Sequence, residues 1–191
     1  MENTVRSERS RNAAIQAALT IIARDGPGRL TLDAIARESG LSKGGLMHQF
    51  RTKEAVLKAL LEHQIKYFEK FAQDYLAEMG PGQPEPYLSA QIATSREATT
   101  EPTSVAFAVI GALAEEPDLL SVAREIDAKK IERIKAEATD PELAMLRWVA
   151  AKGLALTALF GLCPFSGEDR ERLFERLIDS RQWAAFTEAE K

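Results

Sequence analysis

Three side chains able to hydrogen-bond to bases or phosphates, Lys43, His48 and Gln49, are grouped in the short segment KGGLMHQF. In a helix over this segment, Leu46 and Phe50 are four residues apart and point to the same side. These two apolar side chains would face a core, whereas His48 would point roughly the opposite way. The segment therefore predicts a helix that is anchored on one face and presents polar groups to a partner on the other.

Two adjacent glycines, Gly44 and Gly45, weaken this helix, because each costs about 1 kcal/mol relative to alanine in a helix interior. A helix that gives up this stability usually needs close approach to something. The major groove of DNA, about 12 Å wide, admits a helix whose N-terminal residues meet base edges while free N–H groups and basic side chains bind phosphates. We therefore interpret the segment as a DNA-recognition helix. One alternative stays open at this point: the glycines are only a weak helix start, and Lys43 is a solvated surface charge.

The residues before this segment, TLDAIARESGLS, complete a helix-turn-helix pattern. Thr31 can cap a first short helix, in which Leu32 and Ile35 share one face with Ala36. Gly40 can take the positive φ that a sharp turn requires, and Ser42 is a favourable N-cap for the second helix.

The sequence TLDAIARESGLSKGGLMHQFRTKEAVL, preceded by AALTIIARDG, resembles the N-terminal DNA-binding domain of the TetR/AcrR family of transcriptional regulators. The resemblance covers about the first 60 residues. Gly45 and Met47 depart from the commonest pattern, and Met47 lacks the hydroxyl of the tyrosine that is frequent there. The resemblance also implies that Lys53 meets a phosphate. The residues predicted to contact DNA are Thr31, Ser42, Lys43, Gly44, Gly45, Met47, His48, Gln49 and Lys53.

Composition narrows the class of protein further. The chain has 191 residues, 45% of them hydrophobic, which is enough for a real core. One cysteine excludes an internal disulfide, and with only two histidines a Cys/His zinc cluster is not credible, so we expect no metal and no cofactor. No apolar run approaches the roughly 20 residues of a membrane span, and the polar start lacks the apolar core of a signal peptide. We expect a soluble, cytoplasmic protein with no membrane partner.

Charge is distributed unevenly along the chain. The net charge is −4, but residues 1–53 carry nine Lys/Arg and five Asp/Glu, a net charge of +4, and the remainder carries −8. Attraction to phosphate would therefore be local to the N-terminal end.

Helical periodicity and Pro/Gly punctuation predict an all-α fold with no sheet. A polar arm over residues 1–11 precedes a support helix that starts near Arg9, and an uninterrupted helix of about 27 residues, about 40 Å long, starts at Lys53. After the Gly/Pro-rich break at 80–86, helices are expected over roughly 87–99, 103–114, 117–138, 140–162 and 167–184. We predict a helix-turn-helix DNA-binding domain of three helices over residues 1–53, followed by a larger helical ligand-binding and dimerisation domain over 54–191.

The segment 140–162 is apolar over more than one face and contains small residues that allow close helix approach. It is predicted to form a two-fold, four-helix interface with the last helix and their symmetry mates, because a dimer can bind two half-sites of a palindrome. The alternative is a central helix of a monomer. The candidate interface residues are Leu146, Val149, Gly153, Leu156, Phe160, Leu173, Phe174, Leu177 and Ile178.

The resemblance further implies that the middle helices bind an unknown small-molecule effector that changes the separation of the two DNA-binding domains. Aromatic and methionine residues at helical spacing are more often plain core, and Arg96 either counters an anionic ligand or is simply exposed. The candidate pocket residues are Phe68, Phe71, Tyr75, Met79, Tyr87, Ile92, Arg96, Phe107, Ile110, Trp148, Lys152 and Cys163.

An enzyme is not expected, because the sequence has no phosphate-binding glycine loop, no G-x-S-x-G motif and no recognisable pairing of a nucleophile with a base. We hypothesise that the protein is a homodimeric, ligand-responsive regulator that binds a palindromic double-stranded DNA operator. That it acts as a repressor is implied by the resemblance alone. The alternatives are an activator of the same fold and an all-α adaptor whose helix-turn-helix packs against a partner protein.

Overall fold

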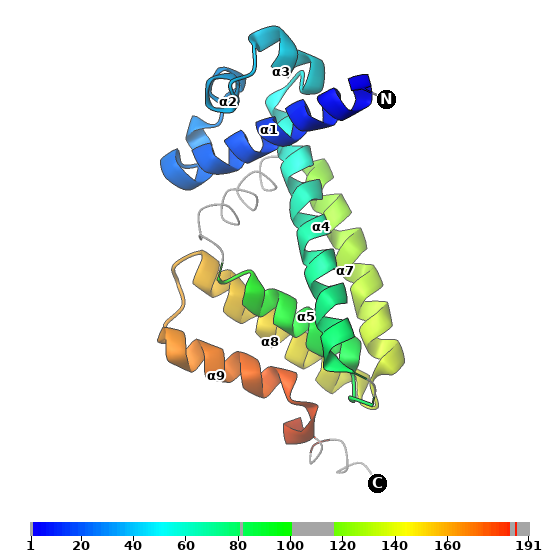
Figure 1. Ribbon diagram of the computed structural model, residues 1–191. Coiled ribbons are helices and arrows are strands. Elements are labelled where there is room, and N and C mark those ends of the chain that lie inside the picture. The colour runs from blue at the N-terminus through cyan, green and yellow to red at the C-terminus, as the bar shows by residue number, and fades with distance from the viewer. Residues whose placement is uncertain (1, 81, 101–116, 184–185, 187–191) are drawn as a thin grey trace. The chain divides into compact units, whose positions relative to one another are not determined.

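The computed structural model describes residues 2–80, 82–100, 117–183 and 186, and this part of the chain is helical without a strand. The elements are α1 Glu2–Asp25, the 3-10 helix η1 Pro27–Arg29, α2 Leu32–Ser39, α3 Lys43–Gln49, α4 Lys53–Met79, α5 Pro86–Glu97, α7 Pro117–Glu137, α8 Pro141–Leu159, α9 Gly167–Ile178 and the 3-10 helix η2 Ser180–Trp183 (Figure 1). The all-α prediction is confirmed. The predicted helix over 103–114 lies outside the described residues.

The chain divides into two compact units within α4, where the first unit reaches Lys66 and the second begins at Tyr67. The predicted domain boundary at Lys53 is the first residue of α4. One long helix therefore contributes to both units.

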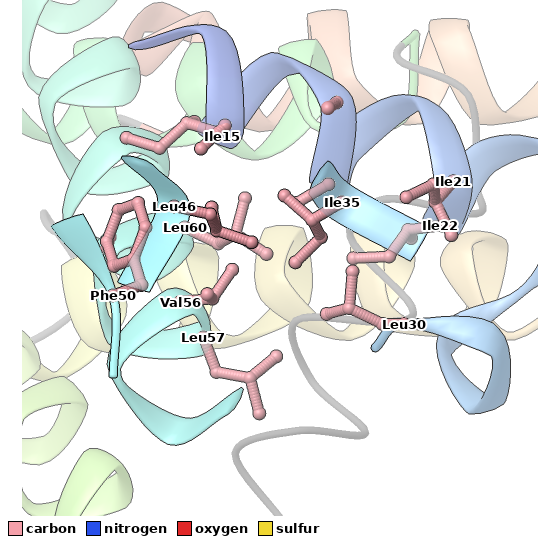
Figure 2. Packing of buried hydrophobic residues seen from close by; sticks show 14 of the residues in the cluster. Ile15, Ile21, Ile22, Leu30, Ile35, Leu46, Phe50, Val56, Leu57 and Leu60 are labelled. Atoms are coloured by element: carbon pink, nitrogen blue, oxygen red, sulfur yellow. The ribbon is translucent and has the colours of Figure 1, made fainter. Parts of the chain in front are cut away.

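The N-terminal unit is built around α1, which packs against both α2 and α3. Its core is formed by buried aliphatic side chains from all four helices together with Phe50, which closes α3 (Figure 2). Leu30, Ile35 and Leu46 are each at most 1% exposed. Because every short helix contributes to this one core, the positions of α2 and α3 are set by packing.

The first eleven residues are not the separate arm that the sequence predicts, because α1 begins at Glu2. No Gly or Pro interrupts this stretch, and Ser10 Oγ donates to the carbonyl of Arg6 one turn earlier. The support helix is thus longer than expected at its N-terminal end.

The second unit is organised around α5, which packs against α8 and α9, and these three helices lie together in Figure 1. Leu88 and Ile92 of α5 are fully buried beside Trp148 of α8 and Phe174 of α9. The carboxylate of Glu137, at the end of α7, accepts hydrogen bonds from the backbone N–H groups of Tyr87 and Leu88. This carboxylate caps the N-terminus of α5 and ties α7 to it.

The ends of α8 and α9 follow local rules. Asp140 Oδ1 accepts from the N–H of Leu143 at the start of α8, which ends at Leu159, shortly before Gly161 with φ of 66°. α8 is therefore shorter than the predicted 140–162 segment. At the start of α9, Ser166 Oγ accepts from the N–H of Asp169 at 3.0 Å and donates to its carboxylate, so Ser166 is the N-cap of this helix.

Over the described ranges, no helix is long and apolar enough to cross a membrane. The same residues contain no group of three or more His, Cys, Asp or Glu side chains placed to hold a metal ion.

Candidate nucleic-acid interface

The turn between α2 and α3 depends on Gly40, which has φ of 69° and ψ of 11°. This left-handed conformation is easily adopted only by glycine, and it ends α2 so that the chain can enter α3 three residues later. The helix-turn-helix predicted from the sequence is therefore present, with both helices close to the expected bounds.

Both short helices have side-chain caps at their N-termini. Thr31 Oγ1 accepts from the N–H of Ala34 at 3.1 Å, and Ser42 Oγ accepts from the N–H of Gly45 at 3.1 Å. Each hydroxyl satisfies one of the backbone donors that a helix start leaves free, and both capping residues are exposed. Thr31 and Ser42 thus have a structural role in addition to any contact with a partner.

The two faces of α3 differ as its spacing predicts. Leu46 and Phe50 are each 1% exposed in the core, whereas Met47, Gly44 and His48 are exposed. α3 is therefore fixed from one side and free to meet a partner with the other.

The two glycines of α3 are not equivalent. A Cβ built on Gly45 would lie 3.1 Å from Ser42 Oγ, which already serves as the helix cap, whereas a Cβ on Gly44 would meet nothing within 4 Å. The protein itself gives a reason for a small residue at Gly45 but none at Gly44. Gly44 therefore leaves open space on the exposed face of α3.

A groove of about 360 Å³ brings together four of the predicted contact residues, Thr31, Lys43, Met47 and Lys53. They come from the cap of α2, from α3 and from the first turn of α4, so the groove runs past three helix starts. Helix N-termini and ammonium groups both favour anions.

Asp33 lines the same groove, and its Oδ1 lies 3.1 Å from Nζ of Lys43. This ion pair joins the first turns of α2 and α3 across the turn. The sequence pattern gives no indication of this ion pair.

Gln49 differs from the other predicted contact residues because it is half-buried and its side-chain amide donates to Ser7 Oγ of α1 at 3.0 Å. The guanidinium of Arg11, also on α1, lies 4.9 Å from the centre of the Phe50 ring and 3.5 Å from the carboxylate of Glu62. The C-terminal end of α3 is therefore held against α1, and Gln49 takes part in that packing.

A second groove of the N-terminal unit, of about 740 Å³, lies beside Thr31 and is lined by Arg29 and Arg37 among others. Both arginines are exposed, whereas Arg24 in the same groove is bound to Asp25 and Glu38. Arg29 and Arg37 are additional candidates for phosphate contacts that were not predicted from the sequence. In the sequence, the two arginines flank the predicted cap residue Thr31, and this position could have indicated them.

Comparison with known families agrees with this geometry. Residues 14–60 match the model described as bacterial regulatory proteins, tetR family, and residues 85–180, just over half of the chain, match the tetracyclin repressor-like C-terminal domain. The chain belongs to the TetR family of transcriptional regulators. The resemblance found in the sequence is confirmed, and α2 and α3 are the DNA-binding helix-turn-helix of a TetR-family protein. The comparison with curated proteins gives no significant match.

Solved TetR-like structures share the fold along nearly the whole chain. The multidrug binding protein EbrR is 22% identical in its complex with imidazole, over 88% of this chain and 89% of that one, with a TM-score of 0.63. In its complex with ethidium EbrR is 23% identical, over 88% and 98%, with a TM-score of 0.59. A TetR family transcription regulator from Marinobacter aquaeolei VT8 is 18% identical, over 94% and 98%, with a TM-score of 0.63.

The predicted pocket residues of α4 lie in the second unit and are half-buried: Phe68, Phe71, Tyr75 and Met79. Phe71 and Tyr75 stack with ring centres 6.3 Å apart, and burial raises the pKa of Tyr75. Met79 also lines a groove of about 540 Å³ beside α9. These four side chains form a continuous apolar face on α4.

The other pocket candidates are dispersed. Ile92 and Trp148 are buried in the core, Arg96 donates from Nε to Glu171 at 2.6 Å, and Cys163 is half-buried between α8 and α9. Arg96 is therefore paired with Glu171 on the partly exposed surface of the second unit, and its contact with an anionic ligand stays a prediction. Phe107 and Ile110 lie outside the described residues.

Two of the candidates, Tyr87 and Lys152, are in contact with charged side chains in the second unit. Tyr87 lies under the guanidinium of Arg133, 4.0 Å from the ring centre. Nζ of Lys152 lies 4.6 Å from the centre of the Trp148 ring and is paired with Asp127. Desolvation by burial lowers the pKa of the neighbouring Lys130, an effect that Asp127 partly opposes.

The interface candidates separate into two groups. Leu146, Val149, Leu156 and Phe160 are 66%, 57%, 41% and 40% exposed, and with exposed Gly153 they follow one face of α8. On α9, Leu173 and Ile178 are half-buried, but Phe174 and Leu177 are buried in the core of the second unit. The assignment of Phe174 and Leu177 to the interface is corrected, because they face α5 and α8 within one chain.

Proposed function

We propose that this TetR-family protein is a homodimeric repressor that binds a palindromic operator and is released by a small-molecule effector. The observation that carries the DNA-binding part is the two-sided character of α3, with Leu46 and Phe50 in the core and Gly44, Met47 and His48 exposed. The groove that contains Lys43 and Lys53 lies beside this exposed face and supplies two cations for phosphates. In this proposal α3 enters the major groove and the starts of α2 and α4 bind the flanking phosphates.

The dimer is supported by the exposed face of α8. Leu146, Val149 and Leu156 present contiguous apolar surface that water solvates poorly, and Gly153 lets a second helix approach closely. A two-fold repeat of this face brings two copies of α8 together, with Leu173 and Ile178 at its margin. Two helix-turn-helix units related by the same axis would then match a palindrome.

Effector binding is supported by the aromatic face of α4 in the second unit. EbrR, which shares the fold, is a multidrug binding protein that has been crystallised with ethidium. Because α4 continues from this face into the core of the N-terminal unit, a ligand that favours one position of α4 also favours one arrangement of the DNA-binding units. The effector's differential affinity for the two arrangements sets the degree of release.

The experiment that tests this function is a footprint of the purified protein on the DNA that flanks its own gene, recorded at two salt concentrations. We expect a protected near-palindrome whose protection weakens steeply as salt rises, because phosphate contacts release counterions. If no site is protected, selection from a random duplex pool separates a distant operator from an adaptor function. Failure to enrich any sequence contradicts the proposed function.

A further inference from the structure

Asp33 places a negative charge on the surface that we assign to DNA. Its Oδ1 lies 3.1 Å from Nζ of Lys43, and the two side chains are 71% and 76% exposed. Asp33, Lys43 and Lys53 line the same groove. We infer that Asp33 holds Lys43 in the free protein and thereby lowers the affinity for DNA of any sequence, an inference that rests on the proposed function.

Fold stability alone gives only a partial reason for this carboxylate. Asp33 is in the first turn of α2, where the helix dipole favours an acidic residue. The dipole would favour a carboxylate elsewhere in that turn as well, but it does not require one directed at Lys43. An ion pair between two such exposed side chains also contributes little to the stability of the folded state. The contact between Asp33 and Lys43 is therefore expected to change how strongly this surface binds DNA.

A phosphate and Asp33 compete for the same ammonium group. When DNA binds, a phosphate oxygen must replace Asp33 as the partner of Lys43, and the carboxylate then lies beside a polyanion without its cation. Placing like charges together across an interface is unfavourable. The affinity of the whole surface for duplex DNA is reduced by this exchange.

The effect should not depend on sequence. Phosphates are identical at every base pair, so a contact to them positions the protein without selecting a site. Non-specific binding depends almost entirely on such contacts. Asp33 thus keeps non-specific binding weak and leaves the preference for the operator to the exposed residues of α3.

The test compares Asp33→Asn with the full-length wild-type protein. Asparagine has nearly the same shape as aspartate but no charge. Two variants serve as controls: Asp33→Glu keeps the charge, and Glu132→Gln removes a similarly exposed carboxylate, paired with Lys135, from the second unit. Affinity is measured for an operator duplex and for an unrelated duplex over a series of salt concentrations. Thermal unfolding of each variant verifies that the fold is retained.

We expect Asp33→Asn to bind both duplexes more tightly, on the order of tenfold per protomer at low salt, with a salt slope steeper by about 0.9 per protomer. Asp33→Glu and Glu132→Gln should stay close to the wild type. In a Lys43→Gln background, the gain from Asp33→Asn should be smaller, because the ion pair is gone and only the repulsion between Asp33 and the phosphates remains.

Three results would overturn the inference. Unchanged or weaker binding by Asp33→Asn would mean that Asp33 does not compete or that it positions Lys43 for DNA. A gain confined to the operator would make Asp33 a base-contacting residue. An equal gain with and without Lys43 would remove the ion pair from the explanation. If the wild type binds neither duplex at any salt concentration, the proposed function itself fails, and this inference fails with it.

Discussion

Nε and Nη2 of Arg147 both donate to the carbonyl oxygen of Leu177, at 3.0 and 2.8 Å. The contact connects α8 to the last turn of α9, whose carbonyl groups have no partner within their own helix. Arg147 is only 2% exposed, and its other terminal nitrogen is paired with Glu85, the residue before α5. Glu85 has φ of 49°, so one guanidinium joins a strained backbone position to two helices.

Replacement of Arg147 by methionine should destabilise the second unit strongly. The substitution leaves the Glu85 carboxylate without its cation and the carbonyl of Leu177 without a donor. Removing one partner of a buried ion pair costs about 3–5 kcal/mol, which should be measurable as a lower free energy of unfolding in urea. Arg172→Ala is the matched control, because Arg172 is 66% exposed, and its loss should cost less than about 1 kcal/mol. Equal effects of the two substitutions would contradict the role of Arg147.

Lys43→Ala and His48→Ala should each weaken operator binding while the protein remains a folded dimer. Lys43 is exposed in the groove that also contains Lys53, and His48 is exposed on the outer face of α3. The loss of either side chain therefore removes contacts to DNA without opening the core. Loss of a phosphate contact by Lys43→Ala should reduce the salt slope by about 0.9 per protomer. Fluorescence anisotropy with a labelled operator measures both effects. Unchanged affinity in both variants would exclude α3 as the recognition helix.

Gly44→Ala should separate stability from binding. A methyl group at this position meets no protein atom within 4 Å, and alanine favours the helix by about 0.5–1 kcal/mol, so thermal stability should rise slightly. DNA affinity should nevertheless fall, because the added Cβ stands where we expect the duplex to approach. Gly40→Ala provides the contrast: φ of 69° disfavours alanine, so that variant should lose stability. A Gly44→Ala protein that binds DNA normally would show that close approach is not needed there.

Val149→Asp should convert the proposed dimer into monomers. Val149 is 57% exposed in the middle of the apolar face of α8, and a symmetric interface would place the new carboxylate close to its own copy. Sedimentation analysis should show half the wild-type mass, and operator affinity should fall because the two half-sites are no longer bound together. Val122→Asp on α7 serves as the control, since Val122 is 39% exposed but lies outside this face. A Val149→Asp protein that remains dimeric would place the interface elsewhere.

Acid should weaken the end of α9 through Asp179. A hydrogen bond from Arg181, followed by one from Gln182, lowers the pKa of Asp179 from 3.8 to about 2. A lowered carboxylate pKa stabilises the folded state above the unfolded pKa, and this contribution is lost as pH falls from 3.8 towards 2. Asp179→Asn should therefore be less sensitive than the wild type to pH in that interval. Carboxyl chemical shifts that report a midpoint near 3.8 in the folded protein would contradict this prediction.

Part of the candidate nucleic-acid interface could be predicted because its contacts are local. The caps made by Thr31 and Ser42 join residues three apart, and the turn needs only the conformation of Gly40. Leu46 and Phe50 lie on one face of α3 simply because they are four residues apart. The helix-turn-helix and its exposed face therefore follow directly from the order of residue types.

The packing of apolar helices could not be predicted in the same way. Leu146, Val149, Phe174 and Leu177 have similar side chains and all occur at helical spacing, yet the first two are exposed and the last two are buried. Periodicity identifies an apolar face but does not state which neighbour covers it.

The sequence by itself determined the helical class, the helix-turn-helix, the main helix caps and the family resemblance, because each depends on residues close together in the chain. Only the tertiary structure decided that Gln49 packs against Ser7, that Asp33 holds Lys43 and that Arg147 joins α8 to α9. Such contacts depend on how helices cross, and a small change in a crossing would replace one partner by another. The geometry of the folded chain, and not the residue types alone, therefore selects among the many charged and polar pairs that this sequence allows.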